Sequence, residues 1–431
     1  MMKAAIYTLG CKVNQYESRV IGEALEQNGY TLVDVKDDAD IYIVNSCTVT
    51  AAADQKTRQR VRKIKREHPQ SIVVLTGCMT QAFPADEAML PEADIILGNK
   101  NNAKLLSLLD TYAKFGKRIV SIEPHATGDR FASAAVRAYD ERTRAIIKIQ
   151  DGCNRFCSYC IIPYSRGRVR SKPLEELKAE VETLAANGYR EVVLVGINLS
   201  SYGQDIGCSF PDAVRCACSV DGIERVRLGS LEPDHITPEV IAQLASLDKL
   251  CPQFHISLQS GCDRTLKTMN RHYTAAEFRA LCASLRNSFP NCTLTTDVMV
   301  GFCGETQADF EESLRFVEEI GFEKLHVFPY SVREGTKAAL MPDHLPKAVK
   351  EARAAQMLAL GETLRSRFFA SNVGKKERVL LESTRKGGMM FGYTANYLPV
   401  LVQTQNAVCG DLVDVMIMDT AQDAVVAQEI R

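Results

Sequence analysis

The sequence predicts an α/β fold with an N-terminal parallel sheet, a partial (β/α) barrel and a small C-terminal β-barrel. Three observations predict it. Short apolar runs alternate with amphipathic stretches up to about residue 122, which is typical of a parallel sheet. About six longer strand–helix units follow from residue 144, more than a simple three-layer fold needs. Beyond residue 375, short apolar runs separated by glycine-rich turns favour a small antiparallel β structure.

The first part contains four expected strands and two expected helices. The strands are 4–9, 41–44, 72–76 and 95–97, and the helices are 15–27 and 50–67. Asn28 and Gly29 end the first helix, because neither continues a helix well. Residues 123–140 have little apolar periodicity, so we expect a linker there.

The second part repeats the same alternation with longer units. Its expected strands are 145–149, 191–195, 224–228, 254–258, 293–299 and 323–328. Its expected helices are 173–187, 237–247, 274–288, 306–320 and 346–370. A chain of 431 residues suggests about three domains. We therefore expect a first domain at 1–122, the linker at 123–140, a second domain at 141–370 and a third at 371–431.

Composition limits the class of protein. Hydrophobic residues make up 46% and charged residues 24%, which excludes a disordered or fibrous chain. The net charge of −1 provides no general attraction to nucleic acid, so any such binding must use local patches. We find no signal peptide and no apolar run near the ~20 residues that cross a bilayer, so we expect a cytoplasmic protein without a membrane partner. The fifteen cysteines are too few for a disulfide scaffold, and in the cytosol they are more often ligands or catalysts.

The densest cysteine motif is a C-x3-C-x2-C loop directly after an expected strand, formed by Cys153, Cys157 and Cys160. Three thiolates at this spacing can hold a four-iron cluster and leave one iron open for chemistry. The alternatives are a zinc site that lacks a fourth ligand, or redox-active thiols. The spacing differs from paired C-x2-C zinc motifs, and no histidine follows within five residues, so we prefer the cluster.

A second group of cysteines is spread along the first part. Cys11, Cys47 and Cys78 each follow an expected strand, at intervals that match one βαβ unit of 30 or more residues. The carboxyl ends of parallel strands meet at one edge of a sheet, so these thiols would converge. Taken singly, each could be a buried small apolar residue. Their repetition at equivalent positions favours a second three-cysteine cluster site.

The other nine cysteines show no comparable pattern, and we interpret them as structural or incidental. They are Cys208, Cys216, Cys218, Cys251, Cys262, Cys282, Cys292, Cys303 and Cys409. The C-x-C pair at 216–218 alone is weak support for a metal site.

The C-x3-C-x2-C loop resembles that of radical S-adenosylmethionine (SAM) enzymes. With the second cysteine group, the whole chain resembles the radical SAM methylthiotransferases, which end in a small RNA-binding β-barrel called TRAM. The matching strings lie at 8–18, 152–170, 255–263, 296–302 and 328–336. Cys303 departs from the usual proline, and the cysteine-containing stretch 207–220 departs from the usual acidic or leucine-rich segment.

This resemblance implies two 4Fe–4S clusters with different roles. Cys153, Cys157 and Cys160 would be the catalytic set, because the open iron of their cluster binds SAM and electron transfer cleaves it to a 5′-deoxyadenosyl radical. Cys11, Cys47 and Cys78 would hold the auxiliary cluster that carries the incoming sulfur. One SAM supplies the radical and a second supplies the methyl group, with electrons from a donor such as flavodoxin or ferredoxin. The resemblance leaves the sulfur donor open.

The string GCKVNQYES around Cys11 is most similar to the branch that acts on threonylcarbamoyladenosine next to the anticodon of tRNA. That branch replaces hydrogen at carbon 2 of the adenine ring with a methylthio group. The alternatives are isopentenyladenosine in tRNA, whose branch reads nearer GCQMN, and a ribosomal-protein aspartate, whose branch reads nearer GCPKN. A non-catalytic iron–sulfur or zinc protein that binds RNA is the alternative from another class, and we weigh it lowest.

Several residues at expected strand ends are candidates for the SAM pocket, because barrel enzymes bind substrates there. They are Gly196, Asn198, Ser230, Glu232, Gln259 and Arg333, and the alternative for each is a packing role at the barrel rim. Arg166 and Arg168 are candidates to bind the threonylcarbamoyl carboxylate.

Three stretches rich in lysine and arginine, 56–67, 142–172 and 365–386, fit phosphate contacts to an anticodon stem-loop. A solvated helix face is the alternative for 56–67.

Overall fold

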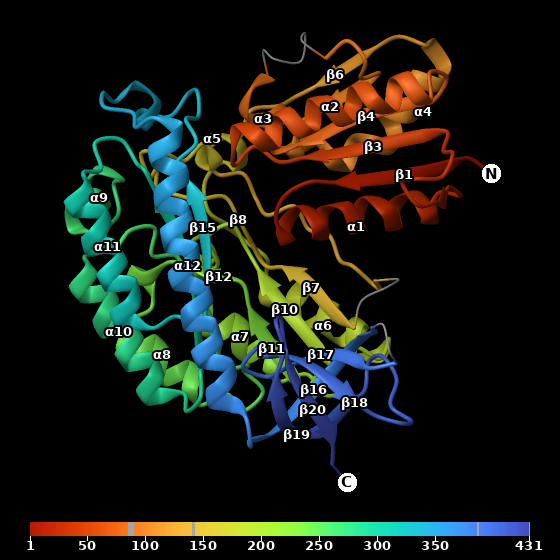
Figure 1. Ribbon diagram of the computed structural model, residues 1–431. Coiled ribbons are helices and arrows are strands. Elements are labelled where there is room, and N and C mark those ends of the chain that lie inside the picture. Colours follow the sequence, from red (N-terminus) through yellow and green to blue (C-terminus); the bar gives the residue numbers. More distant parts are fainter. Residues whose placement is uncertain (85–89, 140–142, 386–387, 431) are drawn as a thin grey trace.

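Three sheet units follow one another in the computed structural model, which describes residues 1–84, 90–139, 143–385 and 388–430. Figure 1 shows the N-terminal sheet beside one end of a curved central unit and a small barrel of strands near the other end. The predicted α/β fold class is confirmed. The limits of independently folding domains remain a prediction. Within the described residues, no helix is long and apolar enough to cross a bilayer.

The N-terminal unit is a six-stranded parallel sheet with strand order β2-β1-β3-β4-β5-β6. Its strands are β1 (Lys3–Thr8), β2 (Thr31–Leu32), β3 (Ile41–Ser46), β4 (Ile72–Gly77), β5 (Ile95–Leu97) and β6 (Ile119–Ser121). Its helices are α1 (Lys12–Gln27), α2 (Ala51–Glu67), α3 (Cys78–Ala82) and α4 (Leu105–Phe115), with a 3-10 turn η2 (Asn99–Lys104). The four predicted strands and two predicted helices are confirmed, whereas β2, β6, α3 and α4 were not predicted.

Helices cover both faces of this sheet. Apolar residues of α1 and α4 pack with one set of strand side chains, and those of α2 pack with the set on the opposite face. Strands buried on both faces read as continuous apolar runs, which is why the sequence reveals them clearly. Helix α1 also contacts the central unit, because Tyr16 donates a hydrogen bond to Glu180 at 3.0 Å.

The central unit is a partial barrel of seven parallel strands in two sheets. The sheets have strand orders β11-β10-β7 and β12-β13-β14-β15. The strands are β7 (Arg144–Lys148), β10 (Glu191–Val195), β11 (Arg225–Leu228), β12 (Ser230–Leu231), β13 (Gln253–Ile256), β14 (Thr293–Val300) and β15 (Lys324–Pro329). A two-stranded ribbon, β8 (Gln150–Asp151) with β9 (Arg170–Ser171), frames the C-x3-C-x2-C loop. The predicted partial barrel is confirmed.

Helices surround this unit, and the long α12 runs along it toward the C-terminal barrel (Figure 1). They are α5 (Ile162–Arg166), α6 (Leu174–Ala186), α7 (Phe210–Cys218), α8 (Pro238–Ala245), α9 (Asp263–Thr268), α10 (Ala275–Ser288), α11 (Gln307–Ile320) and α12 (Lys347–Asn372). Three 3-10 turns are η3 (Leu199–Ser201), η4 (Pro233–His235) and η5 (Lys337–Leu340). The five predicted helices are confirmed, and α7 occupies the stretch that contains the extra cysteines.

The C-terminal unit is a closed five-stranded barrel with strand order β16-β17-β18-β20-β19. Its strands are β16 (Lys376–Thr384), β17 (Met390–Thr394), β18 (Pro399–Gln403), β19 (Leu412–Thr420) and β20 (Val425–Glu429). The predicted barrel is confirmed, but the expectation of purely antiparallel pairing is wrong, because β18 and β20 pair in parallel. Strand directions cannot alternate all the way around a closed ring with an odd number of strands.

Buried arginines fix this barrel to the central unit. Arg227, with 1% of its surface exposed, bonds Glu191 at 2.7 Å and donates to the backbone oxygen of Ala395 at 2.9 Å. Its guanidinium also lies 4.7 Å from the ring centre of Tyr397. Tyr397 has φ of +69°, a conformation that a bulky residue adopts only where the surrounding contacts impose it. The interface therefore holds Tyr397 at a fixed place beside the partial barrel.

Candidate functional site

The first cysteine group lies at the carboxyl edge of three adjacent strands. Cys11 precedes α1 as its N-cap residue, Cys47 directly follows β3, and Cys78 begins α3 after β4. Strands β1, β3 and β4 are neighbours in the sheet, so their carboxyl ends lie side by side. Cys11 is exposed, whereas Cys47 and Cys78 are buried.

Contacts at this edge bring the three thiols together. The sulfurs of Cys11 and Cys78 each lie 3.9 Å from the side-chain oxygen of Asn14. Asn14 is itself fixed, because its amide group donates to the backbone oxygens of Leu9 and Ser46. Cys47 lies against Gly10, where an added Cβ would stand 2.9 Å from the Cys47 sulfur. The sequence-predicted convergence of these cysteines is therefore present in the structure.

Glycine precedes two of these cysteines for a steric reason. Gly10 has φ of +103° and Gly77 has φ of +102°, a region open to glycine and strained for other residues. A Cβ at Gly77 would lie 2.4 Å from the backbone oxygen of Ser46. The two glycines let the chain turn sharply at the strand ends and bring the thiols close.

The second cysteine group occupies the loop between β8 and α5. Several N–H groups point at its sulfurs. Arg271 donates to Cys157 at 3.2 Å, and the backbone N–H of Arg155 donates to Cys153 at 3.4 Å. Arg271 is largely buried and also pairs with Glu232. N–H groups directed at sulfur stabilise thiolate ligands and adjust the reduction potential of a bound cluster.

A buried charge network joins the two cysteine groups. Arg166, 1% exposed, donates from Nε to the Cys78 sulfur at 3.2 Å. Its other nitrogens bond Glu17 on α1 at 2.7 and 2.9 Å and approach Asp151 at 3.3 Å. Asp151 in turn accepts a hydrogen bond from the backbone N–H of Gly152, the residue before Cys153. Burial alone would raise the pKa of Glu17, but the charges of Arg166 and Lys148 reverse this effect and leave it lowered.

This network corrects the prediction for Arg166. Its guanidinium is enclosed and bonded to Glu17, Asn14 and Cys78, so it cannot bind a substrate carboxylate. An arginine is suited to bind an anion, but here it binds acidic side chains of the protein itself.

The donor set fits iron–sulfur clusters. Burial raises the pKa of Cys78 to about 12, although Arg166 acts in the opposite direction, and burial raises the pKa of Cys153 to about 11. A bound metal replaces these protons, and the N–H groups of Arg166 and Arg271 then face thiolates. Among the described residues, no group of three or more His, Cys, Asp or Glu is arranged to hold a single metal ion. The fit to clusters therefore rests on the sulfur donors and the N–H groups around them.

The six SAM-pocket candidates lie in different places. Asn198 is next to Cys153, with its amide nitrogen 3.9 Å from the sulfur, and Glu232 binds Arg271 beside Cys157. Gln259 lines a cavity of about 220 Å³ together with Cys160.

The other three candidates lie elsewhere. Gly196 and Ser230 line a separate pocket that also contains Cys11. Arg333 faces the N-terminal unit, where it bonds Thr48 at 2.7 Å and Asp54 at 2.6 Å, close to Cys47. Asp54 lies on α2, so this contact ties the C-terminal end of the partial barrel to the first cysteine group.

Most cations of the stretch 142–172 are internal, which corrects its interpretation as an RNA-binding patch. Lys148 bonds Glu17 at 2.8 Å, Arg144 bonds Glu382 at 2.5 Å, and Lys172 pairs with Glu180. Arg142 lies outside the described residues.

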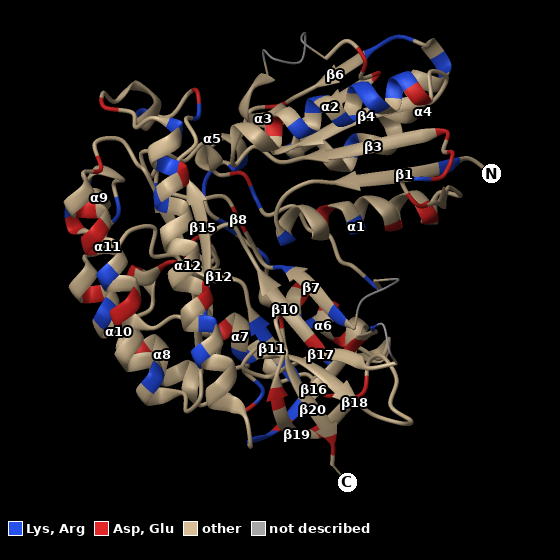
Figure 2. Ribbon diagram, viewed as in Figure 1, with Lys and Arg blue, Asp and Glu red and all other residues tan. Residues whose placement is uncertain are grey.

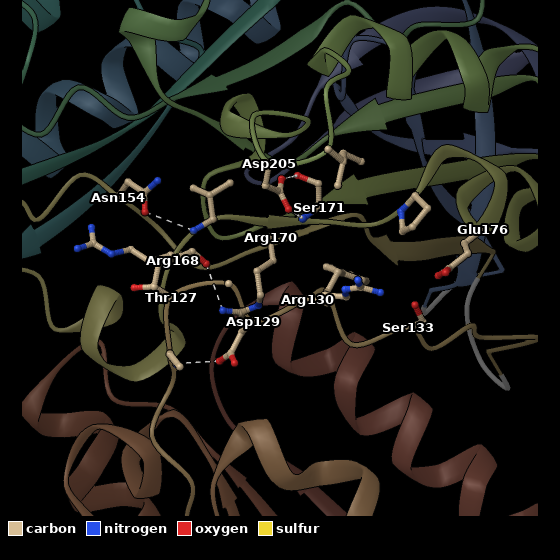
Figure 3. A pocket seen from close by; sticks show the side chains of 16 residues that line it. Thr127, Asp129, Arg130, Ser133, Asn154, Arg168, Arg170, Ser171, Glu176 and Asp205 are labelled. Atoms are coloured by element: carbon tan, nitrogen blue, oxygen red, sulfur yellow. Dashed lines mark hydrogen bonds between the residues drawn. The ribbon is translucent and has the colours of Figure 1, made fainter.

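Arg168 is an exception within this stretch. It borders an open pocket of about 920 Å³ between the segment 126–133 and β9. Figure 3 shows Arg168 near Thr127 and Asn154, with Arg130 toward the other side of the pocket. Arg168 stacks over Phe156, 4.7 Å from the ring centre. In the part of the chain that the structure describes, Arg130 and Arg168 make no ion pair, so both are available to an anion.

The other two basic stretches lie largely at the surface. Figure 2 shows lysines and arginines along α2, of which Lys56, Arg62, Lys63 and Arg66 are exposed. In the stretch 365–386, Arg365 and Arg378 pair with acids, and Lys386 lies outside the described residues.

Sequence reasoning missed three residues that shape the site: Asn14, Glu17 and Arg271. The first two are polar residues on the buried face of α1, and such residues normally need partners. That pattern was visible in the sequence and could have marked them. Nothing in the sequence near Arg271 indicates a contact to a cysteine more than a hundred residues away.

Two family models match the parts of the chain that contain the cysteine groups. The family model described as "Uncharacterized protein family UPF0004" matches residues 3–98, which contain the first cysteine group. The model described as "Radical SAM superfamily" matches residues 147–317, which contain the second group.

A solved structure of the radical SAM methyltransferase TsrM from Kitasatospora setae aligns with a TM-score of 0.56 at 16% identity, over 76% of this chain and 73% of that chain. That likeness concerns the fold alone.

Curated relatives match nearly the whole chain. A Bacillus subtilis protein named threonylcarbamoyladenosine tRNA methylthiotransferase MtaB is 37% identical over 97% of this chain and 94% of its own length. An Aquifex aeolicus protein of the same name is also 37% identical, over 96% of this chain and 100% of its own length. A Pelotomaculum thermopropionicum protein named tRNA-2-methylthio-N(6)-dimethylallyladenosine synthase is 35% identical over 92% of this chain and 90% of its own length. The chain therefore belongs to the radical SAM methylthiotransferase family, enzymes that work with SAM and a 4Fe–4S cluster.

Proposed function

We propose that this enzyme transfers a methylthio group to carbon 2 of threonylcarbamoyladenosine next to the anticodon of tRNA, with SAM and two 4Fe–4S clusters. The observation that carries the proposal is the pair of cysteine groups joined by Arg166. A reaction that removes hydrogen and adds sulfur at one carbon needs both groups to act on the same base. A network that fixes the two loops to each other meets that need.

In this proposal the two cysteine groups have separate tasks. Cys153, Cys157 and Cys160 hold the cluster that binds SAM, and Cys11, Cys47 and Cys78 hold the cluster that carries sulfur. When bound, the SAM cluster supplies the radical chemistry that opens a C–H bond too inert for acid–base catalysis. Arg271 and Arg166 donate N–H groups to one ligand sulfur in each set.

Residues near the second cysteine group are suited to bind SAM. Asn198 and Glu232 lie beside Cys153 and Cys157, and Gln259 lines the cavity at Cys160. An amide and a carboxylate can pair with the amino and carboxylate groups of SAM. Arg333 instead stabilises the segment that follows Cys47.

The choice of threonylcarbamoyladenosine is supported by the string around Cys11 and by the names of two relatives. Isopentenyladenosine remains the alternative, because a relative at 35% identity is named for the dimethylallyl form. For tRNA, the exposed cations of α2, the pocket with Arg130 and Arg168, and the C-terminal barrel would contact phosphates of the anticodon stem-loop. Electrons would come from a donor such as flavodoxin or ferredoxin.

Nucleoside mass spectrometry tests the proposal. Anaerobically reconstituted enzyme is given SAM, dithionite and tRNA that carries threonylcarbamoyladenosine. We expect the 2-methylthio form of that nucleoside to appear, and the triple variant Cys153→Ala, Cys157→Ala, Cys160→Ala to produce none. A methylthio group found on a ribosomal-protein aspartate, with unmodified tRNA, would reject the proposed substrate.

A further inference from the structure

An open pocket of about 390 Å³ lies where the three sheet units meet. Cys11 and Lys12 from the N-terminal unit line it, and Tyr397 reaches it from the C-terminal barrel. Lys324 and His326 come from alternate positions of β15 in the partial barrel, so both face the same side of the strand. The volume lies within the range of small-ligand pockets.

This pocket adjoins the second cysteine group as well as the first. It shares Asp297 and Phe328 with the cavity of about 220 Å³ that Cys160 lines. A base that loses hydrogen at one cysteine group and gains sulfur at the other must lie between them. The pocket with Cys11 in its wall is therefore the place for the modified adenine and the group on its N6 atom.

The pocket has an excess of unpaired positive charge. Within the described ranges, the side-chain ammonium groups of Lys12 and Lys324 make no hydrogen bond or ion pair. Of the acids nearby, Glu191 is bound by Arg227 at 2.7 Å, whereas Asp297 lines the pocket itself and lies 3.3 Å from His255. Both lysines have accessible side chains. Two ammonium groups line the pocket with a single carboxylate, that of Asp297, so the lining keeps a net positive charge that suits an anion.

We propose that Lys12 and Lys324 bind the carboxylate of the threonylcarbamoyl group and so determine which modified adenosine the enzyme accepts. This inference rests on the proposed function. An isopentenyl group in the same place would leave the two ammonium groups without an anionic partner, and such a loss discriminates against an apolar analogue. A tRNA phosphate is the other source of a matching anion, and the experiment separates the two.

The experiment measures binding of anticodon stem-loops to the reconstituted enzyme without reductant. Four stem-loops are compared: threonylcarbamoyladenosine, its neutral methyl ester, isopentenyladenosine and plain adenosine. The ester keeps the size of the group and removes its charge. We expect the wild type to bind the acid about 30-fold more tightly than the ester, because only the acid forms close charge pairs with the lysines. Lys324→Met should reduce this ratio to about threefold or less.

Two further variants make the result specific. Lys12→Gln should reduce the ratio in the same way. The iron content of this variant is measured as well, because Lys12 directly follows the proposed cluster ligand Cys11. Lys347→Met is the matched control, since this lysine on α12 is 88% exposed and does not line the pocket. It should retain the full preference for the acid.

Several outcomes would overturn the inference. If Lys324→Met and Lys12→Gln keep the 30-fold preference, the carboxylate is bound elsewhere. If they weaken all four stem-loops equally and make binding less dependent on salt, the lysines contact phosphates. In both cases a wild type that still methylthiolates threonylcarbamoyladenosine leaves the proposed function intact. A wild type that shows no acid preference and modifies only isopentenyladenosine overturns both.

Discussion

Replacing Cys157 by alanine is expected to abolish SAM cleavage, whereas replacing Cys47 is expected to abolish sulfur insertion alone. Cys157 is one of three proposed cluster ligands in its loop, and it also receives the N–H group of Arg271. Without its thiolate the SAM-binding cluster loses a third of its protein ligands. Cys47 lies at the sheet edge, so Cys47→Ala leaves that loop unchanged.

The measurement is anaerobic incubation with dithionite, SAM and tRNA, followed by quantification of 5′-deoxyadenosine and of methylthiolated nucleosides. Cys157→Ala should give neither product, and Cys47→Ala should give 5′-deoxyadenosine only. Cys409→Ala, at an exposed cysteine of the C-terminal barrel, is the matched control and should give both. A methylthiolated nucleoside formed by Cys47→Ala would show that sulfur does not pass through the first cysteine group.

The second large effect concerns the substrate. The wild type is expected to prefer tRNA with threonylcarbamoyladenosine over tRNA with isopentenyladenosine by ~10⁴ or more in kcat/KM, because a site built to pair polar groups rejects an analogue that lacks them. The two substrates share the adenine ring and the tRNA, so the difference isolates the group on N6. Competition between them in one reaction, followed by mass spectrometry, gives the ratio directly. Comparable rates would assign the enzyme to the isopentenyladenosine branch and leave the methylthiotransferase class unchanged.

Local patterns made the cysteine groups predictable. Cys11, Cys47 and Cys78 each follow a continuous apolar run, and parallel strands place such positions at one edge. The spacing of strands alone therefore predicted a contact between residues that are more than thirty positions apart. The partial barrel was predicted for the same reason, because its strands and helices alternate with clear periodicity.

The predictions of other features failed for identifiable physical reasons. Helix α7 was missed although Ser209 and Asp212 form a capping box at its start, a pattern that the sequence contains. The basic stretch 142–172 was predicted to be an RNA-binding surface because a count of charges in the sequence does not reveal which acids pair with them. Those acids include Glu17 and Glu382, which lie far away in the sequence. Arg333 likewise has its partners on α2 and just before it, far away in the sequence.

The pocket of Lys12 and Lys324 was also beyond sequence reasoning. Its lining comes from three sheet units, and neither lysine belongs to a basic run. Only their shared place in the fold identifies them as a pair.

The central claim is that one chain holds two separate clusters, and iron analysis tests it most directly. Anaerobically reconstituted wild type should contain about eight irons per chain, because each three-thiolate group would hold four. The triple alanine variant at Cys153, Cys157 and Cys160 should retain about half, and so should the triple variant at Cys11, Cys47 and Cys78. About four irons in the wild type, or zinc at one of the two groups, would contradict the two-cluster account.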